Sequence, residues 1–135
     1  VYYCGITTES IYRIRAADLL DESLNRDDLD ARIERYGDAA VCDGITVDTA
    51  GNVYVTDITN NAIGVTRPSG EYEVIARDDR RFLWPRGLCC GADRHIYFPR
   101  TPLHPAPPLN PREGESSHPF ELFRVERLAP LTGGR

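Results

Sequence analysis

Methionine and lysine are both missing from this chain of 135 residues, in which all 16 basic residues are arginine. The missing methionine indicates that Val1 is not a natural start, and the missing lysine indicates the coding bias of a GC-rich, bacterial genome. No apolar run approaches the roughly 18 residues that would span a membrane, and the first residues lack the basic-then-apolar layout of a secretory signal. The net charge of −5, with both signs interspersed, leaves no basic stripe for phosphates. The sequence therefore predicts neither membrane nor nucleic-acid binding.

Cysteine is scarce as well, with four residues at positions 4, 42, 89 and 90. They are too few for a disulfide-dense scaffold, and they lack the paired CxxC spacing of a zinc site. The sequence also lacks a phosphate-cradling glycine loop, a nucleotide fingerprint and a Ser-His-Asp set. Composition alone thus indicates a globular chain and no particular chemistry.

The strongest signal that is present is an internal repeat. An offset of 43 residues places 44–47 over 87–90 and continues without a gap, so that Val53-Tyr54-Val55 falls on Ile96-Tyr97-Phe98. Each copy has an apolar strand, a short polar turn and a second apolar strand. A period near 43 residues with such strands is typical of β-propeller blades, because helical repeats of this length would show 3.6-residue periodicity.

A second offset, of 52 residues, places 53–63 over 1–11, with five of the eleven positions identical. The nine additional residues are explained by an insertion between Ile14 and Cys42, where the pattern becomes helical. The middle repeat has turn-forming residues between four predicted strands. Those strands are residues 44–48, 52–58, 62–67 and 71–77.

The predicted fold class is therefore all-β, as two to two and a half four-stranded antiparallel blades of a propeller. We divide the chain into the end of one blade at 1–41, a complete blade at 42–83 and a last blade at 84–135. A helical insertion is expected at about 16–36, with Asn25 and Asp28 as the cap of a second helix. A proline-rich loop is expected at 99–119, before a third strand at 121–127. Such a segment cannot close a ring of 4 to 8 blades alone.

Residues 42–63, CDGITVDTAGNVYVTDITNNAI, resemble the bacterial, dopachrome tautomerase-related branch of the yellow/major royal jelly protein family. Residues 2–19, WPRGL at 84–88 and the tail at 108–135 are also similar to that family's final blades. The resemblance implies a six-bladed propeller, of which this chain would be the C-terminal third to half. A more distant similarity, to gluconolactonase and senescence-marker propellers, lies in the DG at 43–44.

The sequence departs from the family pattern in its last repeat, where Gly91-Ala92-Asp93-Arg94 replaces the expected glycine-rich turn. Arg86 stands where the recurring motif has an acidic residue, and Pro99 and Arg100 replace what should be a continuing strand. We therefore expect the last blade to be degraded.

The resemblance implies a small-molecule site in the axial cavity, with isomerase activity on an indole-quinone type substrate. A metal-dependent, gluconolactonase-like hydrolase is an alternative, and a non-catalytic secreted binding protein is another. The fragment alone is expected to be inactive. Because family relatives are commonly exported, the expected compartment is extracellular or periplasmic. The expected partners are a small-molecule ligand and either the remaining blades or further copies of the fragment.

Topology predicts where the site lies. In an up-and-down meander, the start of the first strand, the end of the second and the connection to the next blade share one face, around the axial channel. Asp43 stands there, before an innermost strand, and is the best single candidate for a catalytic residue. The similarity to gluconolactonases implies that Asp43 would bind a divalent, calcium-like cation. Hydrogen bonding to the adjoining turn is the alternative role.

The same face should hold further candidates, and each has a competing structural role. Asp57 could instead cap a turn, and Asn60 and Asn61 could adopt the positive φ that a turn needs. Trp84 and Arg86 could simply pack or face solvent. Among the histidines, only His104 falls in a loop on this face, where an imidazole would suit proton transfer in a tautomerisation. The ligand-binding candidates are Asp57, Asn60, Asn61, Trp84 and Arg86.

The cysteines fall into two predicted pairs. Cys4 and Cys42 should lie at the candidate face of adjacent blades, which is compatible with a disulfide or with two reduced, buried thiols. Cys89 and Cys90 should point to opposite faces of an innermost strand, which predicts packing and no bond between them.

Overall fold

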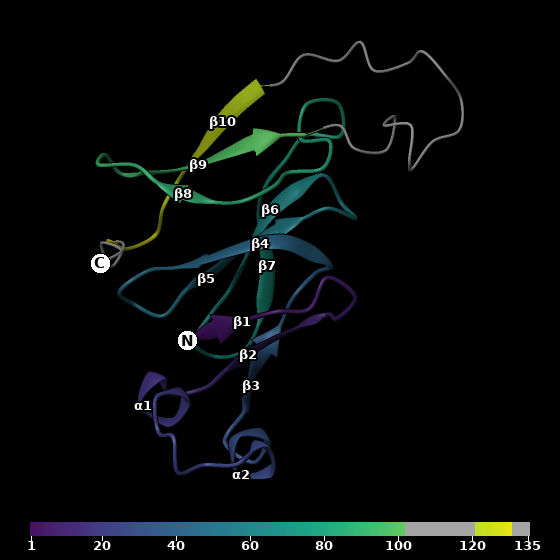
Figure 1. Ribbon diagram of the computed structural model, residues 1–135. Helices are drawn as coiled ribbons and strands as arrows, with labels where there is room; N and C mark the ends of the chain where they lie inside the picture. The colour runs from purple at the N-terminus through teal and green to yellow at the C-terminus, as the bar shows by residue number, and fades with distance from the viewer. Residues whose placement is uncertain (102–120, 131–135) are drawn as a thin grey trace.

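A computed structural model describes residues 1–101 and 121–130, and arranges their strands in three antiparallel sheets in chain order. The sheets pack one against the next (Figure 1). The predicted all-β class is thereby confirmed, with two short helices beside the first sheet. Within the described residues the three sheets do not close into a ring. No helix in this part of the chain is long enough to cross a membrane.

The middle sheet has the four strands that the repeat predicts, in the order β4-β5-β6-β7. Each observed strand lies within two residues of its expected bounds. Asn61 and Gly70, with φ values of 50° and 90°, supply the left-handed backbone of two of its turns. The strands are β4 (Cys42–Val47), β5 (Val53–Asp57), β6 (Ala62–Thr66) and β7 (Tyr72–Arg77).

The first sheet has three strands, and the repeat places the first two over β5 and β6. A helical segment joins the second and third strands, and its second helix begins at the predicted capping box, in which Asn25 and Asp28 bond each other's backbone N–H. The elements are β1 (Tyr2–Tyr3), β2 (Ser10–Arg13), α1 (Ala16–Leu19), α2 (Arg26–Asp30) and β3 (Glu34–Asp38).

The predicted helical insertion is too long at its C-terminal end. Residue Glu34 already begins β3, so Tyr36 lies in a strand and packs against the core between the first two sheets. Its hydroxyl donates to the carbonyl of Gly51 in the middle sheet at 2.7 Å. Pairing with β2 and this contact override the helical spacing of the local sequence.

The third sheet has the order β10-β9-β8. The strand break expected at Pro99 does not occur, because β9 continues through Arg100. In an antiparallel strand the N–H and C=O of one residue point to the same side. The Pro99 carbonyl accepts from the Arg86 N–H at 3.1 Å, so its ring faces away from β10 and removes no bond of that ladder. The strands are β8 (Cys89–Cys90), β9 (His95–Arg100) and β10 (Glu121–Glu126).

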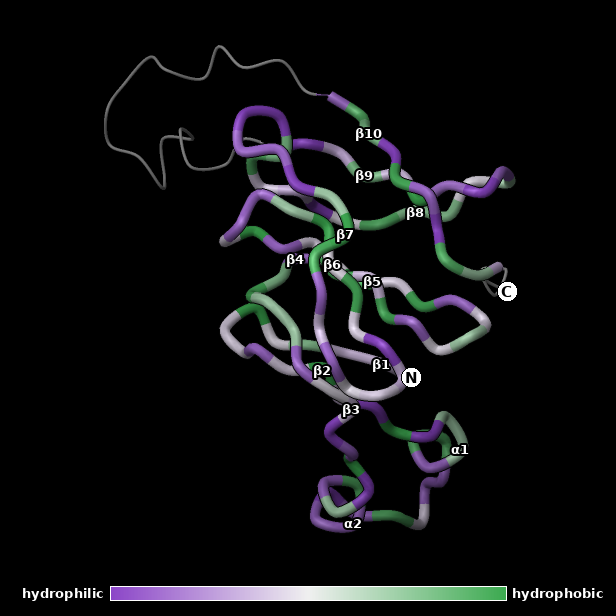
Figure 2. Tube along the Cα trace, turned by 180° about the vertical axis from the view of Figure 1, so that it is seen from behind, coloured by the Kyte–Doolittle hydropathy of each residue, from purple (hydrophilic) through white to green (hydrophobic). Residues whose placement is uncertain are grey.

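The middle sheet is covered on both faces. Val53 and Val55 point into a cluster shared with the first sheet, whereas Tyr54 points into a cluster shared with Ile96 of the third. All residues of β5 and β6 are consequently buried. Figure 2 shows hydrophobic residues around these two strands and a largely hydrophilic α2.

The packing predicted for Cys89 and Cys90 is wrong, since both side chains are exposed. They form a two-residue strand at the edge of the third sheet, where β9 is the one strand that pairs with them.

Candidate functional site

Three predicted site residues meet at one carboxylate. The Trp84 indole Nε1 donates to Asp43 Oδ2 at 3.1 Å, and the Arg86 Nε forms an ion pair with the same oxygen at 3.2 Å. The Asp43 side chain is 19% exposed and that of Arg86 is 52% exposed. We refer to Asp43, Trp84 and Arg86 as the Asp43 cluster, which joins the start of β4 to the connection that leads into the third sheet.

Asp43 is positioned by a bulge at the start of β4. The pairing register with β5 shifts between Cys42 and Ile45. Within this bulge the N–H groups of Asp43 and Gly44 both donate to the Thr56 hydroxyl, at 3.2 and 2.8 Å. Bulges re-aim a side chain out of the regular ladder. The Asp43 carboxylate is thus directed across to Trp84 instead of along the edge of its own sheet.

Trp84 has an unusual backbone conformation, with φ of 51°. A bulky residue in the left-handed region is strained, and such strain is concentrated at functional sites. The conformation is held on both sides of the residue, because the Trp84 carbonyl accepts from Thr101 and Pro85 bridges to Arg100.

Next to the cluster, β4 and the connection that leads into β8 approach each other very closely. A Cβ atom on Gly44 would lie 2.9 Å from the backbone Cα and N of Gly87. These glycines are equivalent in the 43-residue repeat, and Gly87 has φ of 45°. Only a residue without a side chain lets the second and third sheets meet at this distance.

Asp57 is fully buried at the end of β5 and organises the turn that follows. Its carboxylate accepts from the N–H of Thr59 and from both the N–H and side-chain amide of Asn60, at 2.7 to 3.2 Å. Tyr72 also donates to it at 2.9 Å. Burial raises the pKa of Tyr72, and the bond to Asp57 raises it further.

The turn is linked to the same connection as the Asp43 cluster. Asn61 adopts positive φ, and its carbonyl accepts from the Asp78 N–H at 3.2 Å. The structure therefore brings the 57–61 turn and the 78–86 connection to one end of the middle sheet, as topology predicts. Asp57, Asn60 and Asn61 are engaged in the turn itself, and their predicted role in ligand binding is untested. His104 and most of the 99–119 loop lie outside the described residues.

A second set of polar contacts lies at the opposite end of the middle sheet and was not predicted from the sequence. The buried Asp48 carboxylate accepts from the Asn52 amide and from the Tyr54 hydroxyl. In the third sheet, Asp93 accepts from His95 and Tyr97 in the same way. The repeat alignment itself places Tyr97 over Tyr54, and that recurrence is the signal that could have found these contacts.

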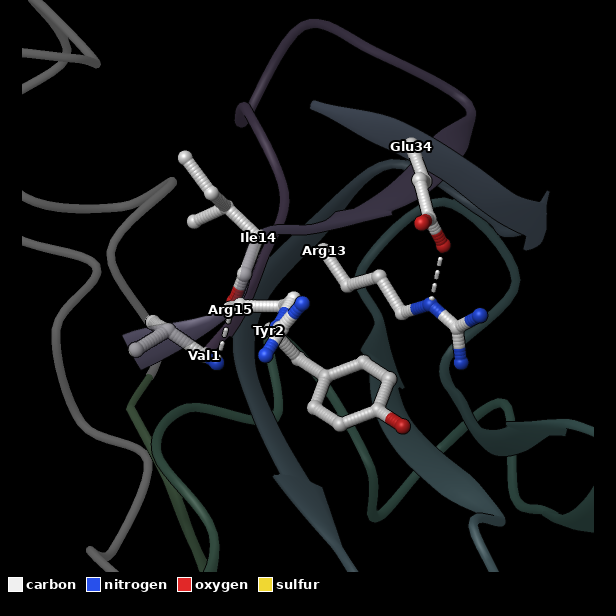
Figure 3. Close-up of a pocket in the computed structure, with 6 residues that line it drawn as sticks. All are labelled: Val1, Tyr2, Arg13, Ile14, Arg15 and Glu34. Atoms are coloured by element: carbon white, nitrogen blue, oxygen red, sulfur yellow. Dashed lines mark hydrogen bonds and ion pairs between the residues drawn. The ribbon is translucent and has the colours of Figure 1, made fainter. Parts of the chain in front are cut away.

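A separate hollow of about 320 Å³ opens at the end of the first sheet (Figure 3). It is bordered by the ion pair between Arg13 and Glu34, at 2.7 Å, and by the terminal amine of Val1, which donates to the Ile14 carbonyl at 2.7 Å. Val1 lies beside Val47, at the far end of β4 from Asp43. The hollow therefore does not belong to the Asp43 cluster.

The cation site predicted at Asp43 fits these residues poorly. A hard cation needs several oxygen ligands, whereas the Asp43 carboxylate is already neutralised by Arg86. Within residues 1–101 and 121–130, no three histidine, cysteine or acidic side chains gather as a metal-binding group. A cation at this position would have to displace the guanidinium.

No protein family matches the chain. No curated protein matches it either.

Proposed function

We propose that this chain is a segment of a β-propeller and that its Asp43 end binds a small molecule at the propeller axis. Three observations support the segment: the repeat of about 43 residues, the four-stranded middle sheet, and the stacking of neighbouring sheets on both of its faces. Six blades and membership of the yellow/major royal jelly family are part of this proposal, and they are carried by the sequence resemblance.

The Asp43 cluster is the observation that carries the binding function. It combines an indole, a guanidinium and a carboxylate from two sheets, at the end of the middle sheet where propeller ligands usually bind. Arg86 keeps half of its side chain exposed while bound to Asp43. Guanidinium groups pair with carboxylates and stack on aromatic rings. The ligand class that suits this arrangement is a planar, aromatic carboxylate.

Isomerase activity on an indole-quinone type substrate extends the proposal. It would require a group that moves a proton on the bound ligand. Asp43 is the only carboxylate of the cluster, and His104 is the second candidate for this step. The ion pair of Asp43 with Arg86 favours binding over metal-dependent hydrolysis, because a paired carboxylate is a weaker ligand for a cation.

The single tryptophan of the chain provides a direct test. We would titrate the ¹⁵N-labelled protein with indole-2-carboxylate and follow the one indole N–H cross-peak, which belongs to Trp84. The proposal expects a saturable shift of this peak, and a much smaller shift with indole, which lacks the carboxylate. Calcium chloride, added in a separate titration, tests the cation alternative with the same peak.

Two variants make the test specific. Arg86→Gln should weaken binding of the carboxylate at least tenfold, whereas Arg94→Gln, an exposed arginine of the third sheet, should leave it unchanged. The proposal is overturned if millimolar indole-2-carboxylate leaves the Trp84 peak in place, or if both variants bind as the unmodified chain does. A saturable calcium shift would instead favour the metal-dependent alternative.

The partners of the chain follow from the same proposal. Apolar side chains remain exposed on the outer sheets, notably Ile6 and Leu122. Exposed apolar surface beside unpaired strand edges is a site of association. We propose that further blades cover it, or that copies of the chain do so. Light scattering on a sizing column should then show assembly, and a sharply melting monomer would contradict the proposal.

A further inference from the structure

Cys4 and Cys42 both lie at the apolar contact between the first and second sheets. Cys4 directly follows β1, and Cys42 opens β4. The Cys42 side chain is 1% exposed in the cluster that also contains Ile11 and Val55, and Cys4 packs against this cluster while remaining partly exposed. The two thiols therefore belong to one apolar cluster that is shared by the first and second sheets.

The two thiols differ in reactivity. The hydrogen bond from Cys42 lowers the pKa of Cys4, against the opposing effects of burial and the Asp43 charge. The pKa of Cys42 is raised, first by its bond to Cys4 and then by burial and nearby acidic residues. Because the thiolate is the nucleophile, the partly exposed Cys4 is the more reactive member.

We propose that Cys4 and Cys42 form a reversible disulfide that joins the first sheet to the second, with Cys4 as the attacking thiol and Cys42 as the resolving thiol.

The reaction partner is a small-molecule disulfide. The Cys4 thiolate attacks one sulfur of that disulfide, so that a mixed disulfide forms and one small thiolate leaves. Cys42 then attacks the Cys4 sulfur, the protein disulfide forms, and the second small thiolate leaves. The two protein thiols lose two electrons, which reduce the small disulfide to two thiols. The two protons of the cysteines pass to those thiols.

The other two cysteines do not compete for this bond. Cys89 and Cys90 are neighbours on β8, in the third sheet. The Cys90 sulfur instead contacts the Thr46 hydroxyl at 3.7 Å, on the opposite side of β4 from the first sheet. We therefore expect the folded chain to form the Cys4–Cys42 disulfide and no other cysteine pairing.

The disulfide would close a loop of nearly forty residues that contains the whole helical segment. Closing such a loop restricts the unfolded chain, and by chain-entropy estimates this raises the melting temperature by roughly 10 °C. It would also fix the start of β4, where Asp43 follows Cys42.

Peptide mapping tests the proposal. The 135-residue chain is equilibrated with oxidised glutathione, alkylated, and digested with trypsin without reduction. Cleavage after arginine, except at the Arg67-Pro68 bond, separates Cys4 on residues 1–13, Cys42 on 36–77 and the remaining cysteines on 87–94. We expect peptide 1–13 linked to 36–77, with reversal by reduced glutathione. The same oxidation in urea, where the chain is unfolded, should give a mixture of different cysteine pairings.

Single variants test the assigned roles. Cys42→Ser should accumulate glutathione on Cys4, and Cys4→Ser should leave Cys42 unmodified because Cys42 is buried. The double variant Cys89→Ser/Cys90→Ser should form the bond as the unmodified chain does. The proposal is overturned if native oxidation leaves 1–13 and 36–77 unlinked, or if Cys42 takes up glutathione more readily than Cys4. The mapping of the unmodified chain decides the first point even if a variant fails to fold.

Discussion

The hydroxyl of Tyr54 donates to Asp48 Oδ2 at 2.9 Å and accepts from the backbone N–H of Leu128 at 2.7 Å. Tyr54 is fully buried in the middle sheet, whereas Leu128 follows the last described strand. One oxygen atom therefore connects the turn of the second sheet with the segment that leaves the third. Its equivalent in the repeat, Tyr97, bonds Asp93 in an exposed setting.

The first prediction concerns this hydroxyl. Tyr54→Phe should lower the free energy of unfolding by about 1 to 3 kcal/mol, because it leaves a buried acceptor and a backbone N–H without their partner. Tyr97→Phe is the matched control and should cost less than about 1 kcal/mol, since water can replace its bond. Urea unfolding of the three proteins measures both. Equal losses in the two variants would contradict the structure.

The second prediction is a loss of stability in alkali. Burial is the main cause that raises the pKa of Tyr54 from 10.0 to about 12. Between these values the unfolded chain releases the Tyr54 proton and the folded chain retains it, so the free energy of unfolding falls as pH rises. By pH 11 the loss from Tyr54 should be about 1 kcal/mol. Urea unfolding at pH 9 and pH 11 measures it, and Tyr54→Phe should reduce the slope.

The third prediction concerns the contact between the second and third sheets. Gly44→Ala should destabilise the protein by about 1 to 3 kcal/mol, because its Cβ would overlap the Gly87 backbone, which cannot rotate away. Gly5→Ala is the control, since its Cβ would meet only the Thr8 side chain at 3.3 Å. Thermal unfolding distinguishes them, and a neutral Gly44→Ala would rule out the close approach.

The fourth prediction concerns the buried turn carboxylate. Asp57→Asn should lower the free energy of unfolding by about 2 to 4 kcal/mol. The two carboxylate oxygens accept from Asn60 and Tyr72, whereas an amide has one acceptor oxygen and would place its own N–H donors against these donors. Asp79→Asn removes an exposed ion pair with Arg77 and should leave stability nearly unchanged. Denaturant unfolding compares them, and similar small effects would show that Asp57 does not hold the turn.

Much of the middle sheet was predictable, because its strands, turns and repeat all indicate the same structure. The start of β3 was not, since the helical spacing up to Tyr36 is local whereas the hydroxyl contact with Gly51 comes from a sheet that follows in the chain. The exposure of Cys89 was missed for a similar reason. A strand's burial depends on what covers it, and the sequence of β8 does not contain that information.

For the site, topology predicted which residues share one end of the sheet, and the contact of Trp84 and Arg86 with Asp43 agrees with it. The pairing itself could not be predicted. It depends on a bulge in β4 and on the positive φ of Trp84, and neither leaves a pattern in residue type or spacing.

Thr49 donates from both its backbone N–H and its hydroxyl to the Pro130 carbonyl, at 2.8 and 2.9 Å, across 81 residues of chain. Contacts between such distant segments form late, and they slow folding because a long loop must close first. On a ribosome that adds about 5 to 20 residues per second, the turn at Thr49 would wait roughly 4 to 16 s for its partner. During that interval the second sheet lacks these two hydrogen bonds, and its incomplete contact surface is exposed to misassembly.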